Sequence, residues 1–191
     1  SLLKKKVKYE FVEDLDPILH KTRHFNEMSL HVNTPYMAIW DVDIVPEKRV
    51  IIDCVQKLEK NEADVAYPYN GNCYNVSKLL RELFIKKKDI RLLHRHKNKI
   101  NLLHNQPLVG GAVLVKKDRF IFSGKENEKI YGWGDDDFCR YYHYLALGFK
   151  IYRARICLFH LWHPRQENSC YENNISRDLS KRELFISQNK V

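Results

Sequence analysis

Two aspartates flank a valine in the stretch IWDVDIVP, residues 39–46, directly after a mostly apolar run. The run YMAIW, residues 36–40, is typical of a buried strand, and Pro46 suits the first turn of a following helix. Asp41 and Asp43 therefore leave the end of a strand together. Because carboxylate oxygens are ligands for divalent cations, this pair predicts a metal site.

A second group with metal-binding chemistry lies far downstream, in CLFHLWHPR. His160 and His163 leave a predicted strand three residues apart, and this spacing allows two imidazoles to share one ion if the backbone bends there. The alternative is that both histidines only pack or cap a turn. With Asp41 and Asp43 they would form a mixed carboxylate and imidazole site, which suits a borderline divalent ion such as Mn²⁺. Such an ion can hold the diphosphate of a nucleotide sugar and offset the charge of the leaving group.

The loop YGWGDDDF combines an aromatic side chain with several carboxylates. Gly132 and Gly134 flank Trp133, and the aspartates at 135–137 begin a helix that Gly148 is expected to end. Any one aspartate there is explained by helix capping, since a carboxylate is favourable at a helix N-terminus. Three carboxylates beside a tryptophan and two glycines also fit a sugar site, where the ring covers the sugar and a carboxylate accepts a hydroxyl proton.

Alternating strands and helices must position these groups. The sequence predicts strands at 6–14, 36–46 and 64–69, with a helix over residues 18–32 between the first two and another after Pro46. This order predicts an α/β fold with a mixed, mostly parallel sheet flanked by helices. Ligands gather at the carboxyl ends of strands in such folds, which is where the two aspartates of IWDVDIVP lie.

The segment 75–105 is predicted to be a helical, basic insertion that contains KKKDIRLLHRHKNK, residues 86–99. A solvated helical face or loop is the favoured interpretation of this charge run. Nucleic-acid binding would require aromatic side chains among the basic residues, and 86–99 contains none, so no nucleic-acid partner is expected.

A further strand is expected in QPLVGGAVLVKK, residues 106–117, which begins at Gly110 and Gly111. Paired glycines allow a ligand to approach the backbone closely, or they mark a β-bulge. The residues alone leave both interpretations open.

Composition limits the remaining possibilities. The chain has 191 residues, and 33 Lys and Arg against 24 Asp and Glu give a formal charge of +9, which suits a phosphorylated substrate, nucleic acid or a membrane surface. The five cysteines include no CxxC pair and indicate neither a disulfide framework nor a zinc site. No apolar run approaches the roughly 20 residues of a membrane helix, and no signal peptide is evident. We therefore expect one cytoplasmic domain, with peripheral association at the inner face of a membrane through its basic surface.

Four motifs in series carry a family resemblance: IWDVDIVP, VGGAVLVKKDRF, YGWGDDDF and FHLWHPR. Their order resembles that in glycosyltransferases of the GT-A fold, and residues 7–165 are similar to the catalytic domain of the beta-1,4-galactosyltransferase family and its bacterial relatives. The resemblance implies that Asp43, His160 and His163 are metal ligands for Mn²⁺. It also implies that Asp41 supports the nucleotide sugar or its metal.

The family's acceptor loop reads Trp-Gly-x-Glu-Asp. Ungapped alignment from Trp133 places its acidic pair on Asp136 and Asp137, so the resemblance implies that Asp137 is the general base and that Asp136 contacts the acceptor. Asp135 is the other candidate for the base and is otherwise assigned to substrate binding. Trp133 would cover the sugar.

The remaining substrate contacts also come from the resemblance. The segment KTRHFNEMSL is similar to the family helix that carries an Arg or Lys and an Asn toward the donor, which implies donor contacts from Arg23 and Asn26. Gly110 and Gly111 are expected to border the substrate.

The resemblance implies a function and two alternatives. The chain begins at the second strand of the family's domain, so we expect one GT-A domain over 1–191 without the first strand and with a helical tail at 166–191. The expected activity is metal-dependent, inverting transfer of a galactose or N-acetylhexosamine unit from a UDP-sugar to a saccharide acceptor, in surface polysaccharide synthesis. The alternatives are a noncatalytic carbohydrate- or nucleotide-binding remnant and, on charge alone, a nucleic-acid-binding protein.

Overall fold

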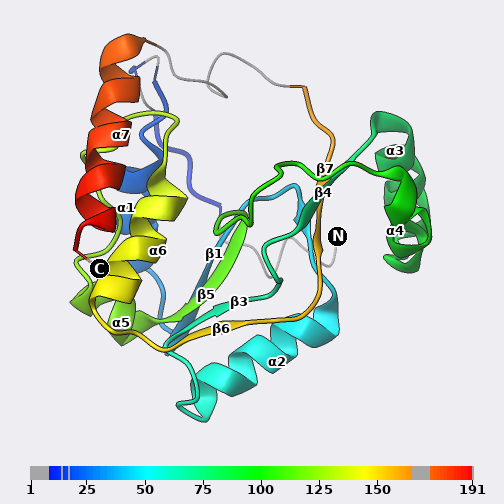
Figure 1. The fold of residues 1–191 in the computed structure, drawn as a ribbon, viewed down its shortest axis with the longest axis horizontal. Helices are drawn as coiled ribbons and strands as arrows, with labels where there is room; N and C mark the ends of the chain where they lie inside the picture. The colour runs from blue at the N-terminus through cyan, green and yellow to red at the C-terminus, as the bar shows by residue number, and fades with distance from the viewer. Residues whose placement is uncertain (1–8, 14, 17, 165–172, 191) are drawn as a thin grey trace.

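Two mixed β-sheets form the centre of the molecule, as a computed structural model shows (Figure 1). The structure describes residues 9–13, 15–16, 18–164 and 173–190. Within these residues the chain forms seven α-helices and one short 3-10 helix. It is therefore a mixed α/β protein, as the alternating patterns predict.

The larger sheet has four strands in the order β1-β5-β3-β6. They are β1 (Tyr36–Trp40), β3 (Val65–Tyr67), β5 (Ala112–Lys116) and β6 (Ile151–Arg153). β5 lies between β1 and β3 and is antiparallel to both, whereas β3 and β6 are parallel. The period of two along β5 sends Val113 and Val115 to one core and Leu114 to the other, so this sheet is buried on both faces.

The smaller sheet has three strands in the order β2-β7-β4. They are β2 (Ile44–Val45), β4 (Cys73–Val76) and β7 (Leu158–Leu161). The predicted strand over 36–46 is thus two strands in different sheets, and residues 41–43 form the crossing between them. This crossing places the two aspartates where the sheets meet.

Helices cover both sheets (Figure 1). α2 (Lys48–Glu59) buries Val50, Cys54 and Leu58 against one face of the larger sheet. The opposite side carries α1 (Lys21–Leu30), α5 (Lys117–Phe122), α6 (Asp136–Ala146) and α7 (Asn174–Gln188). The smaller sheet is covered by α3 (Lys78–Lys87), α4 (Arg91–His96) and the 3-10 turn η1 (Lys97–Lys99).

Two expectations about strands are wrong. Three of the five strand pairings are antiparallel, so the sheets are mixed rather than mostly parallel, because β5 inserts in reverse between β1 and β3. In the predicted strand at 6–14, residues 9–13 have no regular structure, and Tyr9 and Phe11 are exposed. An alternating pattern forms a strand only where a neighbouring strand can complete its hydrogen bonds.

Helix boundaries follow local signals more closely. Gly148 follows the C-cap residue Leu147 of α6 with a left-handed φ of +68°, as expected for a helix-ending glycine. Within the C-terminal segment, Asn173 and Ser176 form a reciprocal capping box at the start of α7. None of the helices in the described ranges has the length and apolarity needed to cross a bilayer.

Candidate functional site

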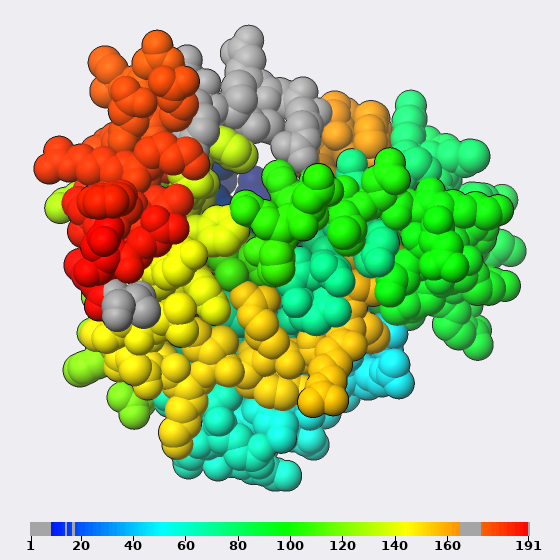
Figure 2. Space-filling model, viewed as in Figure 1, coloured from blue at the N-terminus to red at the C-terminus, as the bar shows by residue number. Residues whose placement is uncertain are grey.

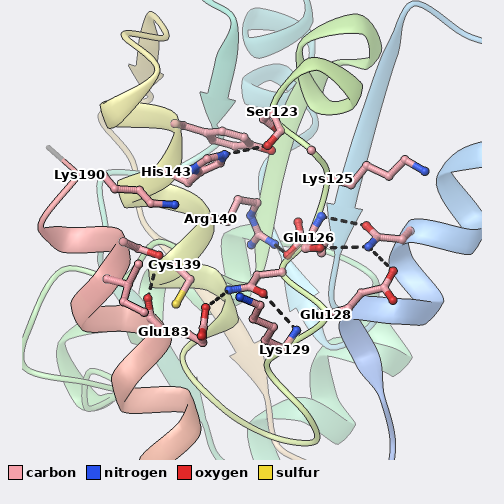
Figure 3. A pocket seen from close by; sticks show the side chains of 16 residues that line it. Ser123, Lys125, Glu126, Glu128, Lys129, Cys139, Arg140, His143, Glu183 and Lys190 are labelled. Atoms are coloured by element: carbon pink, nitrogen blue, oxygen red, sulfur yellow. Dashed lines mark hydrogen bonds and ion pairs between the residues drawn. The ribbon is translucent and has the colours of Figure 1, made fainter.

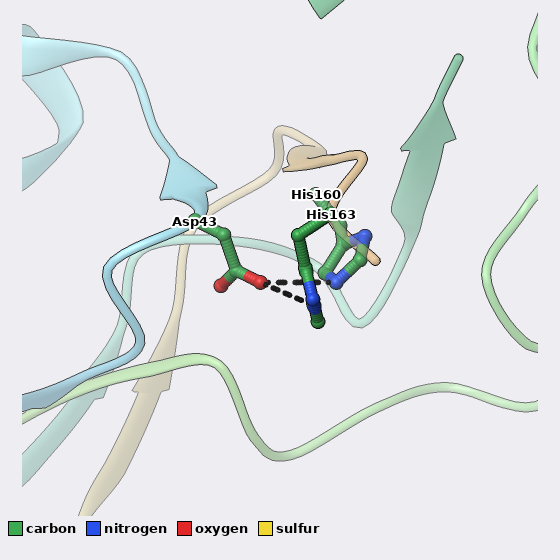
Figure 4. Close-up of side chains that lie close together, drawn as sticks. All are labelled: Asp43, His160 and His163. Atoms are coloured by element: carbon green, nitrogen blue, oxygen red, sulfur yellow. Dashed lines mark ion pairs between the residues drawn. The ribbon is translucent and has the colours of Figure 1, made fainter. Parts of the chain in front are cut away.

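Asp43, His160 and His163 meet where β2 and β7 pair (Figure 4). Asp43 Oδ2 lies 3.2 Å from His160 Nε2 and 3.1 Å from His163 Nε2. The three potential ligand atoms all lie within 4.8 Å of one another. The structure therefore brings Asp43 together with two histidines that lie more than a hundred positions further along the sequence.

The antiparallel register of β2 and β7 causes this convergence. Ile44 pairs with His160, and the amide of Leu161 donates to the carbonyl oxygen of Asp43 at 2.8 Å. Asp43, which precedes Ile44, is thus held beside the end of β7. His163 then follows the strand end closely enough for its ring to lie 5.3 Å from that of His160.

The hydrogen bonds of both imidazoles determine which nitrogen faces Asp43. His160 Nδ1 lies 3.2 Å from Asn75 Oδ1, and His163 Nδ1 lies 2.9 Å from the carbonyl oxygen of Pro164. Both neighbours are acceptors, so each Nδ1 carries the proton and donates. A neutral ring in this tautomer turns its Nε2 lone pair toward Asp43 and can bind a cation there, whereas a protonated ring donates from Nε2 to the Asp43 carboxylate.

The spacing and chemistry of the three atoms fit a divalent ion. Ligand atoms that bind one ion at about 2.1 Å lie roughly 3 Å apart when their bonds meet near a right angle. Two imidazole nitrogens with one carboxylate oxygen suit Mn²⁺, Fe²⁺ or Zn²⁺ better than Mg²⁺. Although burial opposes it, the neighbouring His160 lowers the pKa of Asp43, so this carboxylate is ionised as a ligand must be.

Asp41 is not part of this group. Its carboxylate faces Lys21, with 3.8 Å between Oδ1 and Nζ, and its amide donates to the carbonyl oxygen of Gly111 at 2.9 Å. Burial, together with the charges of Asp137 and Asp43, raises the pKa of Asp41 against the opposing effect of Lys21. Asp41 therefore lies between the metal cluster and a second, acidic cluster.

Lys21 is the centre of that acidic cluster. Its ammonium group lies 3.2 Å from Asp136 and above the ring of Phe25. Burial alone would lower the pKa of Lys21. The negative charges of Asp137, Asp136 and Asp41 outweigh this effect, so the pKa of Lys21 is raised above its ordinary value. Lys21 is thus a permanent cation that holds the carboxylates of two distant motifs together.

Asp137 is held by Arg140, which is buried and lies one turn further along α6. Arg140 also donates to Glu126 at 2.8 Å, so it bridges two carboxylates. Burial would raise the pKa of Asp137, but Lys21 and Arg140 together lower it. Asp137 is therefore an ionised carboxylate in a fixed orientation.

Gly110 provides the space that Asp137 occupies. A β-carbon at position 110 would lie 2.0 Å from Asp137 Oδ2, which no real contact allows. Gly111 has a φ of +80° and bonds to Asp41 through its carbonyl oxygen. Gly110 and Gly111 thus contact both acidic motifs, IWDVDIVP through Asp41 and YGWGDDDF through Asp137. The group that approaches the glycine backbone closely is the Asp137 carboxylate.

Asp136 is more buried than Asp137, with side-chain exposures of 9% and 26%. Its Oδ2 atom makes no hydrogen bond despite the nearby ammonium group of Lys21. Burial and the adjacent charge of Asp137 raise the pKa of Asp136 to about 6. Neighbouring carboxylates with opposite pKa shifts are typical of sites that bind or move protons.

Asp135 points elsewhere. Its amide donates to Ser180 Oγ at 2.8 Å, and its carboxylate pairs with Lys181 at 2.9 Å, both on α7. The adjacent Gly134 packs so closely on Ser180 that a β-carbon would lie 2.5 Å from its hydroxyl. The first aspartate of the loop therefore attaches the loop to α7, while Trp133 stays half exposed beside it.

Arg23 and Asn26 do not join the site. Arg23 pairs with Glu27 on an exposed part of α1. Asn26 is buried and donates to Glu128 Oε1 and to the carbonyl oxygen of Glu126, so it holds the loop that precedes the acidic motif. The donor contacts expected from these two residues stay a prediction, and Lys21 is the cation of α1 that reaches the carboxylates.

A cavity of about 800 Å³ lies between α1, α6 and α7 (Figure 3). Asn26, Glu126 and Arg140 line it together with residues of α7 such as Glu183. It contains no ligand atom of the metal cluster and none of the aspartates at 135–137. Arg140 and Glu126 nevertheless connect it to Asp137 through their ion pairs.

Sequence reasoning missed Lys21 and Arg140. The signal for Arg140 was present, since it follows Asp137 by three residues in a predicted helix and such pairs face each other. Lys21 lies in a segment with several basic residues, and nothing local distinguishes it from Arg23. Only the packing of α1 beside α6 selects it.

Comparison with known proteins adds no identity. No protein-family model matches this chain, and the comparison with curated proteins also finds no match. The function must therefore be inferred from the geometry of the two clusters.

Proposed function

We propose that this protein is a metal-dependent, inverting hexosyltransferase with a GT-A type fold that uses a UDP-sugar donor and a saccharide acceptor. The observation that carries the proposal is the convergence of Asp43, His160 and His163, with Asp41 between this cluster and the acidic cluster of Asp136 and Asp137. A donor diphosphate needs a cation, and an acceptor hydroxyl needs a base. This arrangement supports both requirements within one site.

The metal would be held by Asp43, His160 and His163. When bound, such an ion supplies positive charge that offsets the charge developing on the diphosphate leaving group. Asn75 and the Pro164 carbonyl fix the rings so that both Nε2 atoms remain available as ligands. The acidic cluster adds further attraction for cations, because its four carboxylates outnumber the two cations Lys21 and Arg140. The four carboxylates are those of Asp41, Glu126, Asp136 and Asp137.

Asp137 is the proposed base. It is the more exposed member of the pair and it is ionised, so an acceptor hydroxyl can reach a carboxylate that is ready to take its proton. The acceptor oxygen forms a bond to the anomeric carbon while the bond from that carbon to the diphosphate oxygen breaks. The hydroxyl proton moves to Asp137, and attack opposite the leaving group inverts the anomeric centre.

The other groups orient the reactants. Asp136 lies beside the base, and its Oδ2 atom pairs with Lys21 but makes no hydrogen bond, so it can still accept one from a second acceptor hydroxyl. Trp133 has the exposed apolar ring that packs on a sugar face. Arg140 fixes Asp137, so the base is already oriented before the acceptor binds.

The second candidate is a noncatalytic carbohydrate- or nucleotide-binding module. One observation favours it: Lys21 and Arg140 lower the pKa of Asp137, and a carboxylate that is stabilised as an anion is a weaker proton acceptor. In this case the metal cluster would still bind a nucleotide diphosphate, but no sugar would be transferred.

Calorimetric titration of UDP with and without Mn²⁺ tests the proposal. We expect binding that depends on the metal and is lost in His163→Ala but retained in His31→Ala, a change at an exposed histidine outside the cluster. A panel of UDP-sugars with saccharide acceptors then separates the two candidates. Metal-dependent UDP binding without transfer to any acceptor supports the binding module, and metal-independent binding contradicts both.

A further inference from the structure

Most of the net charge of the chain lies in one short segment. Residues 78–99, which form α3, α4 and η1, contain nine Lys and Arg and two acidic residues, a net +7 of the chain's +9. We call this segment the cationic lobe. It projects from the smaller sheet at the edge of the molecule, on the side away from α6 and α7 (Figures 1 and 2).

The inner side of the cationic lobe is fixed by ordinary core packing. Leu80 and Leu93 are buried against Val76 and Phe159 of the smaller sheet, and Phe84 packs against the same cluster. The lobe is therefore packed onto the smaller sheet through a hydrophobic core, and its outer side faces solvent.

The outer side combines aliphatic and cationic side chains. Leu79, Leu83 and Ile85 of α3 are 69%, 43% and 47% exposed. Leu79 and Leu83 lie one helical turn apart and so share a face, and the exposed residues Lys86 and Lys87 follow at the end of the same helix. Lys87 follows Leu83 by four residues and so lies on the same face, which makes the two leucines an exposed apolar patch bordered by a cation, a combination that marks an interaction surface.

We propose that the cationic lobe docks onto an anionic lipid surface. Lys and Arg side chains are attracted to negatively charged headgroups, while exposed aliphatic side chains enter the boundary between headgroups and acyl chains. A nucleic acid would use the same positive charge, but it offers no environment for Leu79 and Leu83. Phe84 is the one aromatic side chain of Phe, Tyr or Trp type in the lobe and packs inward, so no exposed ring is available for stacking on bases.

Docking would bring the metal cluster close to the membrane. Lys78 begins α3 and lies 5.5 Å from the ring of Trp162, the residue between the two clustered histidines. The inference does not depend on the proposed transferase activity, because lipid binding through this face requires neither metal nor sugar. It would place the site beside any acceptor that is carried on a lipid.

Vesicle flotation of the full chain tests the inference. We expect binding to phosphatidylcholine vesicles that contain phosphatidylglycerol, little binding to phosphatidylcholine alone, and weakening as salt rises. Lys86→Glu with Lys87→Glu should reduce binding by about tenfold or more, since it reverses two charges of the lobe. Leu79→Ser with Leu83→Ser keeps the charge and should still reduce binding by about tenfold.

Matched controls come from the opposite side of the molecule. Lys129→Glu with Lys190→Glu makes the same charge change at exposed lysines, and Phe185→Ser removes an exposed apolar side chain of α7. Both should bind vesicles as the unchanged chain does. All positions are exposed, so circular dichroism should show unaltered folding.

Three results would overturn the inference. One is equal binding to neutral vesicles. Another is loss of binding in the control variants as large as that in the lobe variants. The third is a chain that binds a single-stranded oligonucleotide but no vesicles. If the Leu79→Ser and Leu83→Ser changes also leave the oligonucleotide binding intact, the lobe is assigned to nucleic acid.

Discussion

The carboxylate of Asp137 occupies the space that a side chain at Gly110 would need, with 2.0 Å between Asp137 Oδ2 and the position of a β-carbon. Asp137 cannot move away freely, because Arg140 holds it and is itself held by Glu126. The diglycine before β5 therefore fixes the orientation of the proposed base.

Gly110→Ala should displace Asp137 from its contact with Arg140. We expect loss of sugar transfer by about 10²-fold and a destabilisation of about 1–3 kcal/mol, as for other overpacked positions. Gly124→Ala is the matched control, because a β-carbon there meets nothing within 4 Å and costs only the strain of its positive φ. Melting temperature and transfer rate measure the two effects, and unchanged transfer in Gly110→Ala would show that the position of Asp137 is not critical.

Asp137→Asn should reduce transfer by about 10²- to 10⁴-fold while Mn²⁺-dependent UDP binding survives, since the amide keeps the shape but cannot accept the proton. Asp135→Asn should leave transfer nearly intact, because Asp135 faces Ser180 and Lys181 on α7. Single-turnover assays on both variants distinguish the two residues. The reverse ranking would assign the base to Asp135 and invalidate the ungapped alignment.

Asn75→Ala should weaken Mn²⁺ binding by about 10- to 100-fold, although Asn75 is not a ligand. Its side-chain oxygen accepts from His160 Nδ1, and without it the ring can place its proton on the nitrogen that faces Asp43. Asn75→Asp retains an acceptor and should restore affinity. Paramagnetic resonance of free Mn²⁺ measures both, with the exposed Asn98→Ala as control. Equal affinities in all three variants would contradict the tautomer assignment.

Asp136→Asn should stabilise the protein at pH 7. Burial and the charge of Asp137 raise the pKa of Asp136 from 3.8 to about 6, so its ionised form is less stable in the folded state than in the unfolded state. The folded state then binds more protons between these values, and the stability contributed by Asp136 falls as pH rises through about 6. Removing the charge should add about 1–3 kcal/mol at pH 7.

The advantage of Asp136→Asn should shrink as pH falls and vanish below about pH 3, where Asp136 is protonated in both the folded and the unfolded state. Urea unfolding of the unchanged chain and the variant at pH 4, 5, 6 and 7 measures this difference. A variant that is less stable at pH 7 would mean that the attraction of Asp136 to Lys21 outweighs its burial and its repulsion by Asp137.

Features that depend on neighbouring residues could be predicted from the amino-acid sequence. The apolar run before Asp41 forms β1, the acidic residues at 136 and 137 begin α6, and Gly148 follows its end. These signals are local, because capping, glycine conformation and burial periodicity act within one or two turns. The residue types also suggested the metal cluster, since Asp and His are the ligands that a borderline ion accepts.

Long-range packing selects which residues share a site and which charges they experience. Three features depend on partners that are distant in the sequence. They are the antiparallel direction of β5, the register of β2 with β7, and the packing of α1 beside α6. These contacts choose Lys21 over Arg23, attach Asp135 to α7, and give Asp136 and Asp137 opposite pKa shifts. The physical reason is that a charge responds to every group within a few ångströms, and the sequence does not state which groups those are.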